Sequence, residues 1–313
     1  MAHPLAGVYA AAVTPMGKDQ IPDQDAIVRL LEFLYKKGCH GALLLGTTGE
    51  GPSFSREERA LVIQAAGKFK AQYPGFRLLA GTGSPSLSET INLTSVAFDQ
   101  GFDGVVTLPP YYFKKVDDQG LFDWFTLVMK EAVPEDGYLL AYNIPSLTGV
   151  SFSSVLVSRL KDANPVKFAG IKDSSGDPNF PTSIKGLLGN QFLLMTGNDR
   201  LFGQALQTRA GGCITALANV YSPLLRLEWD RYHRGEQIQT VQEKVTSLRL
   251  ILERYSPYAP TLKLLLRSYH GFENWLVRLP LHEPSLEVAA SILKEFSEAE
   301  LSLDLNALTS MIK

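Results

Sequence analysis

The sequence alternates short apolar runs with stretches of helical periodicity, and this alternation limits the possible folds more than any other feature. Eight runs, mostly rich in Val, Leu, Ile and Ala, lie near residues 8–13, 41–45, 77–81, 104–108, 138–142, 168–172, 192–196 and 211–214. Alternating strands and helices indicate a parallel sheet, and eight strands close a barrel. A doubly wound open sheet would give the same alternation.

The residues at the ends of these runs favour the closed barrel. Polar or otherwise special residues stand at or just beyond the carboxyl ends of the runs: Thr14, Thr47, Thr82, Tyr111, Tyr112, Tyr142, Lys172 and Gly197. In a closed barrel these positions converge on one face, where catalytic residues are found. We therefore expect an α/β fold, an (α/β)8 TIM barrel.

Helical stretches replace the strand pattern beyond about residue 219. They lie near 219–234, 237–255, 260–269, 284–296 and 298–310. We interpret the first as the last barrel helix, so that residues 1–234 form the barrel with the active site and residues 235–313 form a C-terminal helical region packed on it. A chain of 313 residues suits a barrel of about 250 residues with such an extension.

Composition disfavours several classes of protein. The formal net charge is −2 with no basic cluster, which argues against a nucleic-acid partner. No apolar run approaches the length of a membrane-spanning helix. Cys39 and Cys213 stand in apolar surroundings, which is typical of free buried thiols in a reducing compartment, so we expect a cytoplasmic protein.

The sequence gives no sign of a metal or an organic cofactor. Its five histidines are scattered, without a carboxylate or cysteine at a ligand spacing, which disfavours a metal-dependent aldolase. The segment 81–85, G-T-G-S-P, lacks the third glycine of a dinucleotide fingerprint, so a tight barrel loop is the simpler interpretation. We expect no cofactor.

Lys172 is the most informative single residue. It ends an apolar strand, Phe168 to Ile171, and precedes a turn signal at 174–178. Apolar surroundings disfavour the charged form of a lysine, and a free amine at neutral pH can attack a carbonyl and form a Schiff base. The structural alternative is a lysine whose stem covers the strand end while its ammonium reaches solvent.

Several motifs, in order along nearly the whole barrel, resemble those of one enzyme family. They are G-T-T-G-E at 46–50, P-P-Y-Y at 109–112, Y-N-I-P-S-L-T-G at 142–149, G-I-K-D at 170–173 and T-G-N-D at 196–199. This set is similar to the dihydrodipicolinate synthase and N-acetylneuraminate lyase family of pyruvate-dependent class I aldolases. The resemblance implies an (α/β)8 barrel with a C-terminal helical region, a homotetramer built as a dimer of dimers, and pyruvate chemistry through a lysine Schiff base.

The resemblance also implies catalytic roles. Lys172 matches the nucleophile that attacks the keto carbon of pyruvate. Tyr142 matches the phenol that moves protons, and Thr47 the hydroxyl of the same proton relay. Tyr112 resembles the aromatic residue that reaches into a neighbouring subunit's site. Tyrosines and threonines at strand ends are also common packing residues, so the joint spacing with Lys172 carries this interpretation.

Substrate-binding positions follow from the same match. Thr47 and Thr48, with their backbone amides, correspond to the residues that hold the pyruvate carboxylate. Gly197 and Ile214 correspond to pocket-wall positions beside the imine. Ser174 and Thr148 are nearby candidates for hydrogen bonds to the hydroxyl groups of a second substrate.

The sequence departs from members that condense pyruvate with aspartate semialdehyde. Those members carry an arginine for the second substrate's carboxylate five residues after the relay tyrosine, where this chain has Leu147. Arg56, Arg59 and Pro85 replace two histidines and an asparagine of the loop that binds lysine as a feedback inhibitor.

Leu147 matches the lyase branch of the family, but two other positions differ from that branch. Arg200 and Ala216 replace an acid and a serine that contact the polyhydroxyl tail of sialic acid. The segments T-T-G-E-G-P at 47–52 and P-Y-Y-F at 110–113 are closer to aldolases that act on 2-keto-3-deoxy sugar acids.

These features lead to one main hypothesis and two alternatives. We expect a carbon–carbon lyase that reversibly splits a 2-keto-3-deoxy acid into pyruvate and a small aldehyde. Dihydrodipicolinate synthesis is the enzymatic alternative. A barrel that binds pyruvate without turnover is the other, and the intact set Thr47, Tyr112, Tyr142 and Lys172 argues against it, since mere binding needs no proton relay.

Overall fold

A computed structural model describes residues 3–189 and 191–302. Eight parallel strands in this part of the chain close a barrel in sequence order, with β8 paired to β1. The strands are β1 (Gly7–Ala11), β2 (Gly41–Leu44), β3 (Arg77–Gly81), β4 (Gly104–Thr107), β5 (Tyr138–Asn143), β6 (Phe168–Asp173), β7 (Leu193–Thr196) and β8 (Gly212–Thr215). The predicted (α/β)8 TIM barrel is confirmed.

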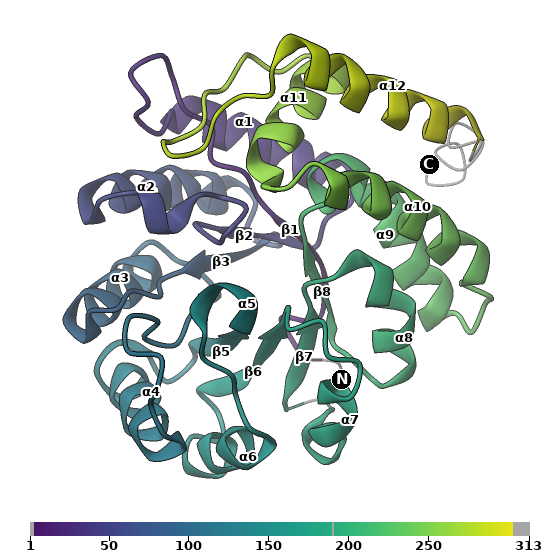
Figure 1. Ribbon diagram of the computed structural model, residues 1–313. Helices are drawn as coiled ribbons and strands as arrows, with labels where there is room; N and C mark the ends of the chain where they lie inside the picture. Colours follow the sequence, from purple (N-terminus) through teal and green to yellow (C-terminus); the bar gives the residue numbers. More distant parts are fainter. Residues whose placement is uncertain (1–2, 190, 303–313) are drawn as a thin grey trace.

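Helices surround the barrel, as Figure 1 shows. The longer ones before residue 234 are α1 (Gln24–Lys36), α2 (Arg56–Gln72), α3 (Leu87–Asp99), α4 (Asp118–Ala132), α6 (Ser154–Ala163) and α9 (Ala218–His233). Shorter helical segments are α5 (Pro145–Thr148), α7 (Phe180–Ser183), α8 (Phe202–Gln207) and the 3-10 turns η1 (Gly51–Ser53), η2 (Lys185–Leu187) and η3 (Asp199–Leu201).

Local sequence explains where these helices begin and what they bury. At the start of α2 the Ser55 hydroxyl accepts from the Glu58 amide, and the Glu58 carboxylate accepts from the Ser55 amide, which is a capping box. Helix α1 buries an apolar stripe that includes Ile27, Leu30 and Leu34. Such stripes pack on the outer faces of the strands and form the larger of two cores.

A second, smaller core fills the inside of the barrel. It consists of Leu5, Tyr9, Ala11, Leu43, Leu79, Val106, Leu140, Tyr142, Ala169, Leu193, Met195 and Ile214. Because successive strand residues point to opposite faces, alternate residues of one strand enter the two cores. Tyr142 and Ile214 belong to the inner core, near the carboxyl ends of their strands.

Three further helices follow the barrel: α10 (Gln239–Arg254), α11 (Tyr258–His270) and α12 (Leu286–Ser302). They contact one another, and α10 and α11 also pack on α9. The predicted break between helices near residue 297 is wrong, because α12 runs through Ser297 without interruption and buries Phe296. The rest of the predicted helix 298–310 lies outside the described residues. The boundary at residue 234 stays a prediction.

A buried ion pair joins this region to the barrel. The Lys263 amine on α11 donates to the Glu50 carboxylate at 2.6 Å and to the Leu276 carbonyl at 2.6 Å. The second Glu50 oxygen accepts from the Arg278 amide at 2.7 Å. The connector between α11 and α12 is therefore held against the loop that follows β2.

Cys39 and Cys213 are buried and free, as expected. Within the described ranges, no helix combines the length and apolar character needed to cross a membrane.

Candidate active site

A cavity of about 350 Å³ opens at the carboxyl ends of the strands. Eight of the site residues predicted from the sequence line it: Thr47, Thr48, Tyr142, Leu147, Lys172, Ser174, Gly197 and Ile214. Their convergence follows from barrel closure, because these residues come from loops or strand ends far apart in the sequence. Tyr112 and Thr148, which were also predicted, do not line the cavity.

Lys172 is buried inside this cavity. Lys172 stands on the fully buried strand β6, and the residue as a whole is 3% exposed. The alternative of a lysine whose ammonium reaches solvent is therefore wrong. The Lys172 Nζ atom lies 4.1 Å from the centre of the Tyr142 ring. Among the described residues, no carboxylate oxygen lies within 4.0 Å of this amine. It is therefore a buried amine without an ion-pair partner.

Tyr142 connects Lys172 to the loop after β2. The Tyr142 and Thr47 hydroxyl oxygens lie 3.4 Å apart, and either can donate. Burial by itself would raise the pKa of Tyr142, but the Lys172 charge and hydrogen bonds with Thr47, Lys172 and Ser174 outweigh it, so the pKa is lowered. A phenol with a lowered pKa can both give and take a proton more readily.

The glycine-rich loop after β2 is tightly folded. A Cβ atom at Gly51 would lie 2.0 Å from the Leu45 carbonyl oxygen, so the loop requires glycine there. The Thr14 hydroxyl donates to the Gly49 carbonyl at 2.6 Å and fixes the loop to the first strand's end. Within the described residues, the amides of Thr47 and Thr48 donate to no backbone carbonyl. These amides remain available to a ligand.

Ser174 and Gly197 form the wall on the β6–β7 side. The Ser174 amide donates to the Asn143 carbonyl at 2.8 Å, and the Gly197 amide to the Asp173 carbonyl at 2.7 Å. A Cβ atom at Gly197 would lie 1.9 Å from the Ser174 hydroxyl oxygen. Glycine at 197 is therefore what lets the Ser174 hydroxyl occupy this wall.

Leu147 lies at the cavity mouth on the short helix α5 and is 61% exposed. The neighbouring Thr148 was expected to offer its hydroxyl to a substrate, and this prediction is wrong. The Thr148 hydroxyl is buried and donates to the carbonyls of Ile144 and Val150, at 3.1 and 2.9 Å. It completes the turn that ends α5.

Tyr112 does not reach the cavity of its own chain. Its side chain is 73% exposed and contacts Phe113 edge to face, with ring centres 5.1 Å apart. An exposed pair of aromatic rings is compatible with the predicted contact with a neighbouring subunit, which stays a prediction.

The C-terminal helices contribute residues that the sequence did not indicate. Arg249 of α10 and Tyr258 of α11 line the cavity together with Asn198, Ser256 and Pro257. Arg249 and Glu253 stand four residues apart, a spacing typical of an exposed ion pair on a helix. The sequence therefore carried no signal that Arg249 lies beside the cavity.

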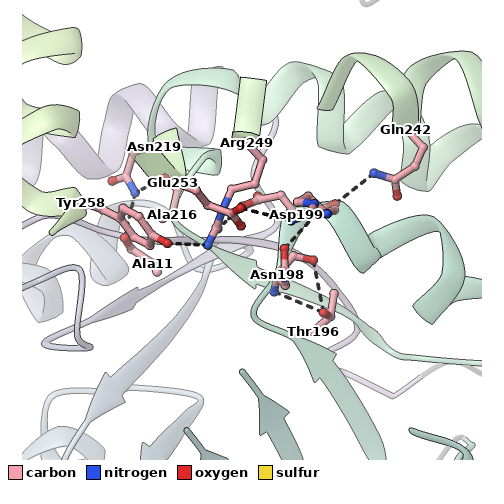
Figure 2. Close-up of polar contacts among 11 residues, drawn as sticks. Ala11, Thr196, Asn198, Asp199, Ala216, Asn219, Gln242, Arg249, Glu253 and Tyr258 are labelled. Carbon is pink, nitrogen blue, oxygen red and sulfur yellow. Dashed lines mark hydrogen bonds and ion pairs between the residues drawn. The ribbon is translucent and has the colours of Figure 1, made fainter. Parts of the chain in front are cut away.

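Figure 2 shows how Arg249 is held. Its guanidinium donates to Asp199 at 2.6 Å, to Glu253 at 3.1 Å and to the Tyr258 hydroxyl at 2.9 Å. Burial would lower the pKa of Arg249, but Asp199, Tyr258 and Glu253 outweigh it, and the pKa is raised. Arg200 pairs with Glu253 at 3.2 Å and does not line the cavity.

In the described part of the chain, no group of three or more His, Cys, Asp or Glu side chains could hold a metal ion. The cavity offers one amine, two phenols, aliphatic hydroxyls, backbone amides, the Asn198 side-chain amide and one guanidinium.

Known proteins resemble this chain over nearly its whole length. A model described as the Dihydrodipicolinate synthetase family matches residues 4–299. An uncharacterized DapA-like lyase of Chloroflexus aurantiacus is 34% identical over 93% of this chain and 96% of its own. The 4-hydroxy-tetrahydrodipicolinate synthase of Ehrlichia canis is 30% identical over 95% of this chain and 98% of its own.

The fold agrees with solved structures as well. The 4-hydroxy-tetrahydrodipicolinate synthase of Methylacidiphilum fumariolicum superposes with a TM-score of 0.85 at 28% identity, covering 96% of this chain and 98% of that one. Together with the arrangement of the cavity, these matches show that the chain belongs to the dihydrodipicolinate synthetase family.

Proposed function

We propose that the protein is a class I aldolase that reversibly cleaves a 2-keto-3-deoxy acid into pyruvate and an aldehyde. Carbon–carbon lyase chemistry is that of its family. The observation that carries the proposal is the buried Lys172 amine beside the Tyr142 ring, at 4.1 Å, in a cavity of about 350 Å³. Such a volume suits a small-molecule substrate.

Lys172 supplies the nucleophile. Its amine attacks the keto carbon, and loss of water from the resulting carbinolamine leaves an iminium that withdraws electrons. Cleavage then breaks the bond between C3 and C4. Its electron pair moves toward the iminium to give an enamine, while the C4 hydroxyl loses its proton and the aldehyde departs. Protonation of the enamine at C3 and hydrolysis release pyruvate and restore the amine.

Tyr142 and Thr47 move the protons. Tyr142 is the register partner of Lys172 on the neighbouring strand, and its hydroxyl oxygen lies 3.4 Å from the Thr47 hydroxyl oxygen. In this proposal the phenol gives a proton during carbinolamine breakdown and accepts the C4 hydroxyl proton during cleavage. Tyr112 of an adjacent subunit would complete the relay and connect it to solvent.

The remaining residues bind the substrate. The hydroxyls and free amides of Thr47 and Thr48 suit the carboxylate of pyruvate, since converging N–H groups bind small anions. Gly197 and Ile214 flank the imine, and the Ser174 hydroxyl is available to the part of the substrate that becomes the aldehyde.

Dihydrodipicolinate synthesis is the alternative that the named relatives favour. It requires binding the carboxylate of aspartate semialdehyde, and Leu147 offers no hydrogen bond for that purpose. Arg200 is paired to Glu253 and does not line the cavity. The homotetramer and the cytoplasmic location stay predictions.

A panel of substrates distinguishes these functions. Pyruvate release is measured from several 2-keto-3-deoxy acids, beside condensation of pyruvate with aspartate semialdehyde. We expect the highest kcat/KM for a 2-keto-3-deoxy acid. Highest kcat/KM for aspartate semialdehyde would favour the synthase, and imine formation without turnover of any substrate would favour a binding protein.

A further inference from the structure

The cavity has a second polar wall away from Lys172. Arg249 begins it from α10, Tyr258 from the first turn of α11, and Asn198 from the loop after β7. Lys172 and Arg249 are the charged side chains that line the cavity, and no carboxylate lines it in the described part of the chain. A substrate anchored on Lys172 would extend its far end toward this wall.

Arg249 is fixed in place before any ligand arrives. It is 6% exposed, and three hydrogen bonds from its guanidinium hold it to Asp199, Glu253 and Tyr258. A guanidinium carries more N–H groups than these bonds use, so donors remain for a ligand in the cavity. A rigid donor costs little conformational entropy on binding.

The groups beside Arg249 add further donors. The Tyr258 hydroxyl oxygen accepts from Arg249, which leaves its own proton free to donate. Asn198 lines the cavity, and its side-chain oxygen accepts from the Arg200 amide at 3.0 Å, so its NH2 group is the part of the side chain that can donate to a ligand. This wall therefore suits a ligand that presents acceptor oxygens.

The charges at this wall cancel. The positive charges of Arg249 and Arg200 are matched by the carboxylates of Asp199 and Glu253, in contacts of 2.6 to 3.2 Å. Asp199 is fully buried and turned toward Arg249. A wall with donors but little net charge binds neutral hydroxyl groups and gives an anion little extra attraction.

From this geometry we infer that Arg249, Tyr258 and Asn198 form a subsite for the hydroxyl-bearing far end of the substrate. The C-terminal helices thus determine which aldehydes the barrel accepts. This inference rests on the proposed aldolase function and goes beyond it by naming the substrate class, an uncharged polyhydroxy aldehyde, and the residues that select it.

Tyr258→Phe tests the subsite with a minimal change, and Tyr255→Phe is its matched control. The Tyr255 hydroxyl donates to Glu295 at 2.6 Å and does not line the cavity. Addition of pyruvate is measured with glycolaldehyde, with the longer D-erythrose, and with succinate semialdehyde as an anion of similar length. Each variant is also tested for borohydride trapping of pyruvate.

We expect Tyr258→Phe to lower the preference for D-erythrose over glycolaldehyde about three- to tenfold, the usual effect of one neutral hydrogen bond. The loss should appear mainly in the KM for D-erythrose. Arg249→Lys, which keeps the charge but not the planar donor set, should lower the same preference. Tyr255→Phe should leave it unchanged.

Two outcomes would overturn the inference. One is an unchanged preference in Tyr258→Phe and Arg249→Lys while pyruvate trapping and glycolaldehyde addition persist; this would leave the aldolase function intact. The other is a loss confined to succinate semialdehyde, which would make the wall an anion site. Failure of the wild-type protein to trap pyruvate would remove the aldolase function itself, and the subsite with it.

Discussion

Tyr142 and Lys172 are register partners on β5 and β6, and the Lys172 amine lies 4.1 Å from the centre of the Tyr142 ring. Paired positions on neighbouring parallel strands project from the same face of the sheet. The pairing of two buried strands, and not a loop, therefore places the phenol beside the amine. This relationship gives the proposed chemistry a fixed geometry.

The Tyr142 hydroxyl should matter for turnover more than for binding. Tyr142→Phe removes one oxygen, so pyruvate should still be trapped on the protein while kcat falls about 10²-fold or more, the usual effect of a positioned acid–base group. Tyr9→Phe is the control, because Tyr9 is buried in the inner core and its hydroxyl has no partner among the described residues. Near-normal kcat in Tyr142→Phe would show that protons travel another way.

Complementation tests the role of Tyr112. Lys172→Ala and Tyr112→Phe should each be nearly inactive alone. Subunit exchange between them should restore activity, because some mixed sites combine Lys172 from one chain with Tyr112 from its neighbour. Mixing Lys172→Ala with Tyr142→Phe should restore nothing, since Tyr142 and Lys172 line the same chain's cavity. Absence of restoration in the first mixture would contradict a cross-subunit tyrosine.

Leu147 should make aspartate semialdehyde a poor acceptor, because leucine cannot form the two charge-assisted hydrogen bonds of an arginine. Leu147→Arg should raise kcat/KM for aspartate semialdehyde about tenfold, a modest gain because residue 147 is 61% exposed. Leu147→Met should not raise it. Free lysine should not inhibit the wild-type protein. A wild-type preference for aspartate semialdehyde over every hydroxyaldehyde would contradict this account.

Glu228 should make stability depend on pH. Burial, and then the nearby Asp199, raise its pKa from 4.5 to about 8. Between these values the folded protein keeps a proton that the unfolded chain loses, so stability falls as pH rises from 4.5 toward 8. The free energy of unfolding of the wild-type protein should fall by about 3–6 kcal/mol over this range, since one pKa unit is about 1.4 kcal/mol. Glu228→Gln should abolish this decrease. Urea unfolding at pH 5 and pH 8 measures this; equal pH dependence in both proteins would contradict it.

The barrel and the position of its lysine could be predicted because both depend on short-range patterns. Apolar runs followed by turn signals mark buried parallel strands, and Lys172 stands at the end of one. Strand ends in a closed barrel must converge, so the predicted residues from separate strands meet in one cavity. Gly197 is one of these residues, because it directly follows β7.

The second wall could not be predicted. Apolar periodicity shows that α10 and α11 pack on something, but it does not say which end of the barrel they cover. Arg249 has the spacing of an exposed helix pair, yet it is buried and bonded to Asp199, which lies after β7 and far away in the sequence. The hydrogen-bond partner of the Thr148 hydroxyl could not be predicted either, since the sequence allows a bond to a substrate as well as a bond within the turn that contains Thr148.

Borohydride reduction in the presence of pyruvate tests the central claim most directly. The account predicts that the mass of reduced pyruvate is added to the peptide that contains Lys172, and that Lys172→Ala abolishes this adduct. Lys263→Arg serves as a control, because Lys263 is also buried but is paired with Glu50 at 2.6 Å; it should leave the adduct in place. An adduct on another lysine, or one that persists in Lys172→Ala, would contradict the account.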